Sequence, residues 1–199
     1  MHGAAIALLR HFPTDWNEEG RLQGRVDRPL TDAARDALRR FRPPPPWDAA
    51  EIVASPLSRA ADTARALWPD APNRVDPRLV ELDMGAWEGR RGADLLADPA
   101  SGFRPVSEWG WDGGPPGGES PRAAFARVAP LLAEIARAGR ATVLVAHRGL
   151  MRAILAVAWG WDYDRPEPFA IKRARLHPLR LDAGGAPVAP DPPIRLIPR

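Results

Sequence analysis

Short apolar runs alternate along this chain with segments that have helical periodicity. Residues 4–9 and 141–146 are apolar on both faces, as expected for strands in the middle of a sheet, and residues 51–54 form another predicted strand. This alternation favours an α/β fold in which helices cover both faces of a mostly parallel sheet. The predicted helices run from 32 to about 41 after the cap Thr31, over 60–67 after the cap Ser58, from Ser120 to near Gly139, and over 150–159.

The rest of the chain is less regular. Residues 97–118 contain glycine, proline and tryptophan without a clear period and are expected to be an irregular excursion over one face. A weak strand is predicted over residues 78–82, and one or two edge strands around Ile171 and Leu179. The proline-rich residues 186–199 are expected to be a poorly ordered tail.

The composition excludes several classes of protein. None of the 199 residues is cysteine, so a disulfide framework and a thiolate zinc site are excluded. No apolar run is long enough to cross a bilayer, and we expect a soluble, cytoplasmic protein without a signal peptide. The formal net charge of +3 is a weak argument for nucleic-acid binding. The length suits a single domain over residues 1–199.

Histidines follow the two most apolar predicted strands. His11 stands just after residues 4–9, and His147 stands just after residues 141–146. Because ligands of parallel α/β sheets bind beyond the carboxyl ends of the strands, both histidines are expected at one edge of the sheet. The chain has one lysine and many arginines. A guanidinium can hold a phosphate or carboxylate through two parallel N–H bonds, which an ammonium cannot do.

Four local patterns occur in an order that resembles a known family. They are Arg10-His11 with Thr14, Asn17, Arg21, Gln23 and Gly24; Ser55-Pro56-Leu57-Ser58-Arg59; Glu81-Leu82-Asp83-Met84-Gly85-Ala86-Trp87-Glu88-Gly89; and Ala146-His147-Arg148-Gly149. Together they resemble the histidine phosphatase superfamily, also called phosphoglycerate-mutase-like, over roughly residues 4 to 160. The compact length looks more like the small phosphatases of that group, including the alpha-ribazole phosphatase type.

The resemblance implies a fold and an activity. The fold is a three-layer α/β/α sandwich whose central sheet has about six strands. The activity is metal-independent hydrolysis of a small phosphate ester, without a cofactor and with His11 as the nucleophile. The family assigns proton transfer to the glutamate matched by Glu81, for which Asp83 and Glu88 are competitors. The other implied site residues, which bind phosphate, are Arg10, Asn17, Gln23, Gly24, Arg59 and His147.

The chemistry of phosphate esters supports this assignment independently. A phosphate monoester is a dianion, and the cationic groups Arg10 and Arg59 would hold its oxygens and neutralise the charge that develops. Attack by a ring nitrogen of His11 would divide one difficult displacement into two easier ones. Nearby guanidinium charge should lower the pKa of His11 and keep the nucleophile neutral.

Several residues depart from the family pattern. Phe12 and Arg148 stand where the family commonly has glycine, so Phe12 is expected to change the pocket wall, and Arg148 either points away or adds a cation. Cofactor-dependent mutases carry a tyrosine three residues after the acid glutamate, where this chain has Met84. This difference favours hydrolysis over mutase activity. Trp109 and Trp111 are candidates to face the substrate.

Other interpretations remain open. A phosphomutase is the alternative enzyme, and a catalytically silent protein that binds a phosphorylated ligand is the alternative of another class. Nucleic-acid binding is a distant third. The oligomeric state is not readable from the sequence. His2 and His177 are expected to be incidental to function.

Overall fold

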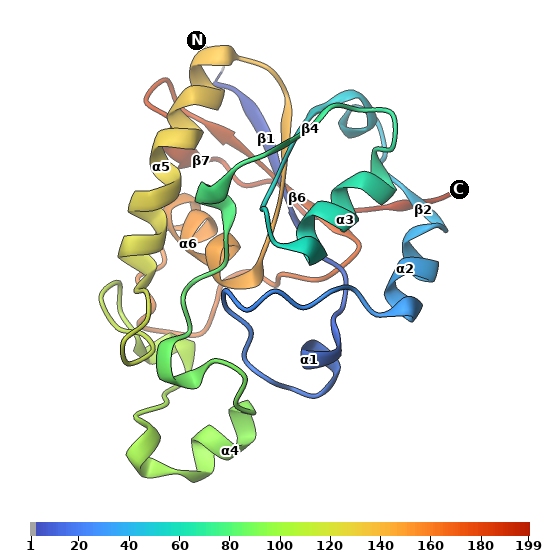
Figure 1. The fold of residues 1–199 in the computed structure, drawn as a ribbon. Helices are drawn as coiled ribbons and strands as arrows, with labels where there is room; N and C mark the ends of the chain where they lie inside the picture. Colours follow the sequence, from blue (N-terminus) through green and yellow to red (C-terminus); the bar gives the residue numbers. More distant parts are fainter. Residues whose placement is uncertain (1–2) are drawn as a thin grey trace.

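The computed structural model describes residues 3–199, so His2 lies outside the described residues. A seven-stranded sheet forms the centre of the molecule (Figure 1). Its strands follow the order β4-β3-β5-β1-β6-β7, and β8 also pairs with β6. The bounds are β1 (Ala5–Arg10), β3 (Glu51–Ala54), β4 (Asn73–Val75), β5 (Thr142–Ala146), β6 (Arg175–Leu181), β7 (Pro187–Val188) and β8 (Ile194–Arg195).

The centre of the sheet is parallel. Strands β4, β3, β5 and β1 pair in parallel, while β6 is antiparallel to β1 and to its partners β7 and β8. In the pairing of β1 with β5, Leu9 lies opposite Val145 and Arg10 opposite Ala146. The residues that follow, His11 and His147, therefore leave the sheet at the same edge. This confirms the fold class and the position expected for the two histidines.

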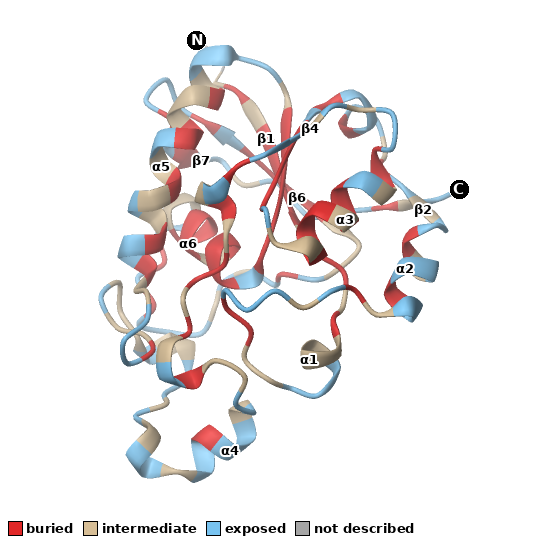
Figure 2. Ribbon diagram, viewed as in Figure 1, coloured by how far each residue is buried: buried red, intermediate tan, exposed pale blue. Residues whose placement is uncertain are grey.

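Helices cover both faces of the sheet. On one face α2 (Asp32–Leu38) and α3 (Ser58–Leu67) pack with Ala7 and Leu9 of β1 in one apolar cluster. On the other face α5 (Pro121–Ala138) and α6 (Arg148–Trp159) pack with Ile6 and Leu8 in a second cluster. Alternate residues of a strand point to opposite faces, so β1 contributes side chains to both apolar clusters. Figure 2 shows the buried strands between helices whose outer faces are exposed.

Helix caps explain several boundaries. Thr31 accepts a hydrogen bond from Ala34 N–H at the start of α2, and Ser120 accepts one from Ala123 N–H at the start of α5. Gly139 ends α5 in the left-handed conformation, with φ at 70°. The expectation that Ser58 caps α3 is wrong, because Leu57 holds that position and Ser58 is already the first helical residue.

The weaker strand predictions need correction. Residues 78–82 form no strand; the strand lies earlier, at β4, and a 3₁₀ turn over Pro77–Leu79 follows it. Proline at the first position of that turn and the cap Asp76 favour the turn. Ile171 lies outside any strand. Leu179 belongs to β6, which is not an edge strand because β1 pairs on one side of it and β7 and β8 on the other.

The ends of other elements also differ from expectation. Helix α2 stops at Leu38, because β2 (Phe41–Arg42) begins shortly afterwards and pairs with β9 (Ile197–Pro198). The proline-rich tail, expected to be poorly ordered, contains two strands. Strand β8 pairs with β6 in the central sheet, and β9 pairs with β2 in a separate two-stranded sheet. The first loop contains one helical turn, α1 (Asp15–Glu18). The long irregular excursion begins after α4 (Gly92–Ala97) and contains two 3₁₀ turns, Pro99–Ser101 and Val106–Glu108. Within residues 3–199, no helix combines the length and apolarity that a bilayer crossing requires.

Candidate active site

Backbone pairing of β1 with β5 places the two histidines side by side. The N–H of His11 donates to the carbonyl of Ala146 at 3.0 Å, which extends the strand ladder past the end of β1. The centroids of the His11 and His147 rings lie 5.2 Å apart. Because the sheet itself sets this separation, residues more than 130 positions apart in sequence are held together without a connecting loop.

The hydrogen bonds of His11 determine which nitrogen is free. Its Nδ1 lies 2.6 Å from the carbonyl oxygen of Phe12. A carbonyl only accepts, so Nδ1 carries the proton and Nε2 keeps the lone pair. Burial lowers the pKa of His11 well below its usual value, and the positive charges of Arg59 and Arg10 lower it further. The ring is therefore neutral, as a nucleophile requires.

His147 is neutral as well, and both of its ring nitrogens form hydrogen bonds with other side chains. Its Nδ1 accepts from Arg59 Nε at 3.2 Å, so the ring proton is on Nε2, which donates to Ser55 Oγ at 2.8 Å. Burial, followed by the charge of Arg59, lowers the pKa of His147 well below its usual value. Both ring nitrogens are therefore engaged, one by Arg59 and the other by Ser55.

Arg59 is fully buried in the first turn of α3. Besides His147, it donates to the carbonyl of Val26 at 3.0 Å and to the carbonyl of Gly24 at 2.7 Å. Each terminal guanidinium nitrogen still has a second N–H. These contacts fix the guanidinium beside the histidines and tie it to the loop that follows α1.

Arg10 directly precedes His11 in sequence, and its side chain lines a cavity at this edge of the sheet. Among residues 3–199, no hydrogen-bond acceptor reaches its buried Nε. Burial lowers the pKa of Arg10 to about 9, and the neighbouring charges of Arg173 and Arg148 add to this effect. A half-buried guanidinium with an unpaired nitrogen is a favourable site for an anion.

Glu81 is held at the N-terminus of α6. One carboxylate oxygen accepts from the N–H groups of Leu82 and Leu150, and the other accepts from Gly149 N–H, all at 2.9 Å. Three backbone donors fix the orientation of the carboxylate. Glycine at position 149 leaves room for this carboxylate, because a Cβ there would lie 2.6 Å from one of its oxygens and would displace it.

The loop residues fall into two groups. Asn17 and Gln23 line the cavity, and Thr14 links them, because it donates to Gln23 Oε1 at 2.8 Å while its N–H donates to Asn17 Oδ1. Gly24 does not line the cavity, and its N–H donates to Glu88 at 3.1 Å. The geometry thus gives Gly24 a packing role, because a Cβ there would lie 2.6 Å from the carbonyl oxygen of Leu82.

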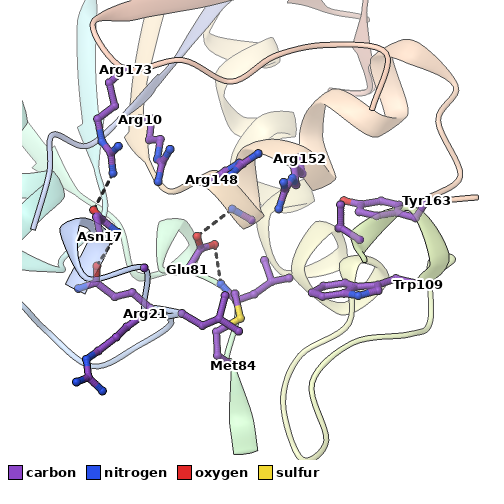
Figure 3. Close-up of a pocket in the computed structure, with 16 residues that line it drawn as sticks. Arg10, Asn17, Arg21, Glu81, Met84, Trp109, Arg148, Arg152, Tyr163 and Arg173 are labelled. Atoms are coloured by element: carbon purple, nitrogen blue, oxygen red, sulfur yellow. Dashed lines mark hydrogen bonds between the residues drawn. The ribbon is translucent and has the colours of Figure 1, made fainter. Parts of the chain in front are cut away.

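A cavity of about 370 Å³ opens beside these groups (Figure 3). Arginine side chains gather along one side of it, and the rings of Trp109 and Tyr163 lie at one end. His11, His147 and Arg59 are not part of its lining and are almost completely buried. The lining residues are Arg10, Asn17, Gly20, Arg21, Leu22, Gln23, Glu81, Leu82, Met84, Val106, Trp109, Arg148, Gly149, Arg152, Tyr163 and Arg173.

The structure decides several points that the sequence left open. Phe12 does not form the pocket wall; it packs in the core against Phe41. Arg148 adds a cation, because its side chain lines the cavity. Trp109 faces the cavity, whereas Trp111 is not part of the lining and donates to Asp162.

Glu81 is the only one of the three candidate acids in the lining. Asp83 instead accepts from Gly85 N–H, and Glu88 accepts from the N–H groups of Gly24 and Val26. Within residues 3–199, no cluster of three or more His, Asp or Glu side chains has the spacing to hold a metal ion.

Sequence reasoning missed two cationic residues of the cavity, Arg152 and Arg173. Arg152 stands four residues after Arg148, a spacing that places both on one face of α6, so a helical projection would have found it. Arg173 lies in a segment without secondary structure, where no periodicity indicates which way a side chain points.

Comparison with known proteins gives a consistent result. A family model described as "Histidine phosphatase superfamily (branch 1)" matches residues 6–189. A "Probable phosphoglycerate mutase GpmB" from Enterobacter sp. is 39% identical over 86% of this chain and 80% of that protein. A "Glucosyl-3-phosphoglycerate phosphatase" from Mycobacterium tuberculosis is 35% identical over 78% of this chain and 75% of that protein.

Solved structures share the architecture. "Mycobacterial hydrolase 1" superimposes with a TM-score of 0.79 at 29% identity, over 99% of this chain and 100% of that one. The alpha-ribazole phosphatase of Shigella flexneri has a TM-score of 0.75 at 23% identity, over 94% of this chain and 95% of that one. The second likeness concerns the fold alone.

Proposed function

The chain belongs to the histidine phosphatase superfamily, and from this premise we propose that it hydrolyses a small phosphate monoester through phospho-His11. The observation that carries the proposal is the state of His11: a neutral ring whose Nε2 has no hydrogen-bond partner among the described residues, close enough to the charges of Arg59 and Arg10 for both to lower its pKa. The relatives named as phosphatases support hydrolysis.

The first step transfers the phosphoryl group to the enzyme. The Nε2 lone pair of His11 attacks phosphorus, the N–P bond forms, and the bond from phosphorus to the ester oxygen breaks. Arg10 and Arg59 stabilise the charge on the oxygens that do not react. An alkoxide is a poor leaving group, so the protonated carboxyl of Glu81 gives its proton to the departing oxygen.

The second step restores the enzyme. Glu81, now a carboxylate, takes a proton from a water molecule as the water oxygen attacks phosphorus. The N–P bond breaks, its electron pair returns to His11, and inorganic phosphate leaves. The three N–H groups that bind Glu81 hold its carboxylate in a fixed orientation for this step. For its role as the acid, Glu81 must be protonated while substrate is bound.

The test is to trap the intermediate. Wild-type protein mixed with an aryl phosphate and quenched rapidly should gain one acid-labile phosphoryl group, located at His11 by mass spectrometry. His11→Ala should gain none and should not hydrolyse the ester, while its circular dichroism spectrum stays unchanged. His177 is buried in β6, away from the cavity, so His177→Ala is the matched control and should still be labelled. Full activity of His11→Ala would refute the nucleophile.

A mutase is the second candidate, because relatives with mutase names match most of the chain. Met84 lines the cavity three residues after Glu81, where the resemblance places a tyrosine in the cofactor-dependent mutases. We therefore expect 3-phosphoglycerate with a bisphosphorylated primer to give inorganic phosphate. Formation of the 2-isomer faster than phosphate, followed by phosphorus NMR, would favour the mutase.

A further inference from the structure

Besides Arg10 and Arg21, three arginines line the cavity. Arg148 and Arg152 extend from α6, and Arg173 extends from the segment before β6. Figure 3 shows their guanidinium groups along the same side of the cavity as Arg10. The mechanism above uses Arg10 and Arg59 for the transferred phosphoryl group and leaves these three without a task.

The protein does not neutralise their charge. Arg152 forms an ion pair with Glu167, and Arg148 approaches the same carboxylate only to 3.8 Å. Arg173 donates to the amide oxygen of Asn17 at 2.8 Å, which is a neutral partner. Among the described residues, Glu167 is therefore the one carboxylate within ion-pair distance of these three guanidiniums, although Glu81 acts on Arg148 and Glu18 on Arg173 from further away.

Buried guanidinium nitrogens of these arginines also lack hydrogen-bond partners within residues 3–199. Among the described residues, the buried Nε atoms of Arg152 and Arg173 have no hydrogen-bond partner. Burial lowers the pKa of Arg148 and of Arg173, and the charge of a neighbouring arginine adds to the effect in each case. Repelling cations with unmet donors are costly in a free protein, and a bound anion relieves that cost.

The position of Arg148 relative to Glu81 indicates which part of a substrate it meets. Glu81 is bound by Gly149 N–H, directly after Arg148 in sequence, and in the proposed mechanism Glu81 faces the oxygen of the leaving group. Arg148 and, one turn further, Arg152 therefore lie on the leaving-group side. Met84, Val106 and Trp109 provide an apolar lining to the same cavity, which suits a short carbon skeleton.

We propose that the leaving group of the substrate carries a second anionic group, a carboxylate or a phosphate, bound by Arg148 with help from Arg152 and Arg173. This inference rests on the proposed phosphatase activity and narrows its substrate class. Arg148 is the residue that decides it, since it stands where the resemblance places a glycine and its only carboxylate partner is distant and shared.

The test uses three esters that differ only at the far end: 3-hydroxypropyl phosphate, 2-carboxyethyl phosphate and propane-1,3-diyl bisphosphate. Wild-type protein should hydrolyse at least one anionic ester with a kcat/KM about tenfold or more above that of the hydroxypropyl ester, mainly through a lower KM. Tenfold corresponds to about 1.4 kcal/mol, a typical value for a charge-assisted contact. A preference for the carboxylate or for the bisphosphate identifies the anionic group.

Variants connect the preference to Arg148. Arg148→Ala should reduce the ratio of anionic to neutral kcat/KM about tenfold, and Arg148→Lys should retain part of the ratio because the charge remains. Arg173→Gln should lower the ratio in the same direction, which provides a second test at another element. Arg137 lies exposed near the end of α5, outside the cavity, so Arg137→Ala is the matched control and should leave the ratio unchanged.

The outcomes separate the two proposals. If an aryl phosphate labels His11 but the three esters react equally and Arg148→Ala leaves their ratio unchanged, the second anionic group is refuted and the phosphatase stands. If no ester is hydrolysed and no label appears on His11, both proposals fall.

Discussion

At the scale of single residues, neighbours decide what each catalytic group can do. The carbonyl of Phe12 selects the tautomer of His11, and Arg59 and Ser55 select that of His147. The sequence identified both histidines, Arg59 and Glu81, because each belongs to a local pattern. It could not identify Ser55 as the partner of His147, since that contact joins β3 to β5 across 92 positions and depends on the register of the sheet.

Replacement of Glu81 tests the proton transfer. Glu81→Gln keeps the shape but cannot protonate a leaving oxygen, so hydrolysis of alkyl phosphates should fall about a hundredfold or more. Aryl phosphates should lose far less, because an aryloxide leaves without a proton. The kcat/KM values with one ester of each kind check this, because kcat/KM reports the transfer to His11 and not the later hydrolysis of phosphohistidine, in which Glu81 acts as the base. The amide N–H₂ of glutamine cannot accept from the N–H groups at the start of α6, so the substitution also disturbs the local geometry. A loss that comes from this disturbance would appear with the aryl ester too, which therefore serves as its control. Equal losses on both esters would remove Glu81 from the acid role.

At the scale of elements, local signals predicted the strands and helices best where they were strong. Residues 141–146 and the Ser120 to Gly139 pattern correspond closely to β5 and α5. The signals failed where tertiary pairing decides the outcome. Strands β2 and β9 are two residues long and exist because they pair with each other, and β4 continues the sheet on polar residues, Asn73 and Arg74. Short strands of this kind carry no periodicity of their own.

The cap of α5 offers a test at this scale. Ser120 Oγ accepts the N–H of Ala123 at the start of the 18-residue helix that covers one face of the sheet. Ser120→Ala should lower the free energy of unfolding by about 1 kcal/mol, measured by urea denaturation. Ser120→Asp restores an acceptor at the positive end of the helix dipole and should recover most of the loss. Equal stability of Ser120→Ala and the wild type would show that the cap contributes nothing.

At the scale of the whole molecule, buried histidines make stability depend on pH. The pKa values of His11, His147 and His177 all lie below the ordinary value of about 6.5, chiefly because each ring is buried. The unfolded chain therefore binds more protons than the folded one between each folded pKa and about 6.5. The stabilisation is fully present above that pH and is lost as the pH falls below it.

Acid should thus weaken the fold well before the carboxylates titrate. Each histidine contributes up to about 1.4 kcal/mol per pH unit below pH ~6.5, so His11 and His147, whose pKa values lie well below that value, together approach about 3 kcal/mol per unit. Urea unfolding at pH 7.5, 6.5 and 5.5 measures the slope. His11→Gln should reduce the slope by one histidine's share, because glutamine does not titrate. A free energy of unfolding that stays constant or rises from pH 7.5 to 5.5 would contradict the burial of neutral imidazoles.

The ladder between β1 and β5 fixes His11, the proposed nucleophile, beside His147 through main-chain bonds, whereas Val106 and Trp109, which face the cavity, belong to the excursion outside the sheet. The reacting groups and this apolar part of the lining consequently have separate supports. Evolution can exchange the excursion, and engineers can graft one from a relative, to redirect the enzyme towards other esters while the reacting atoms keep their spacing.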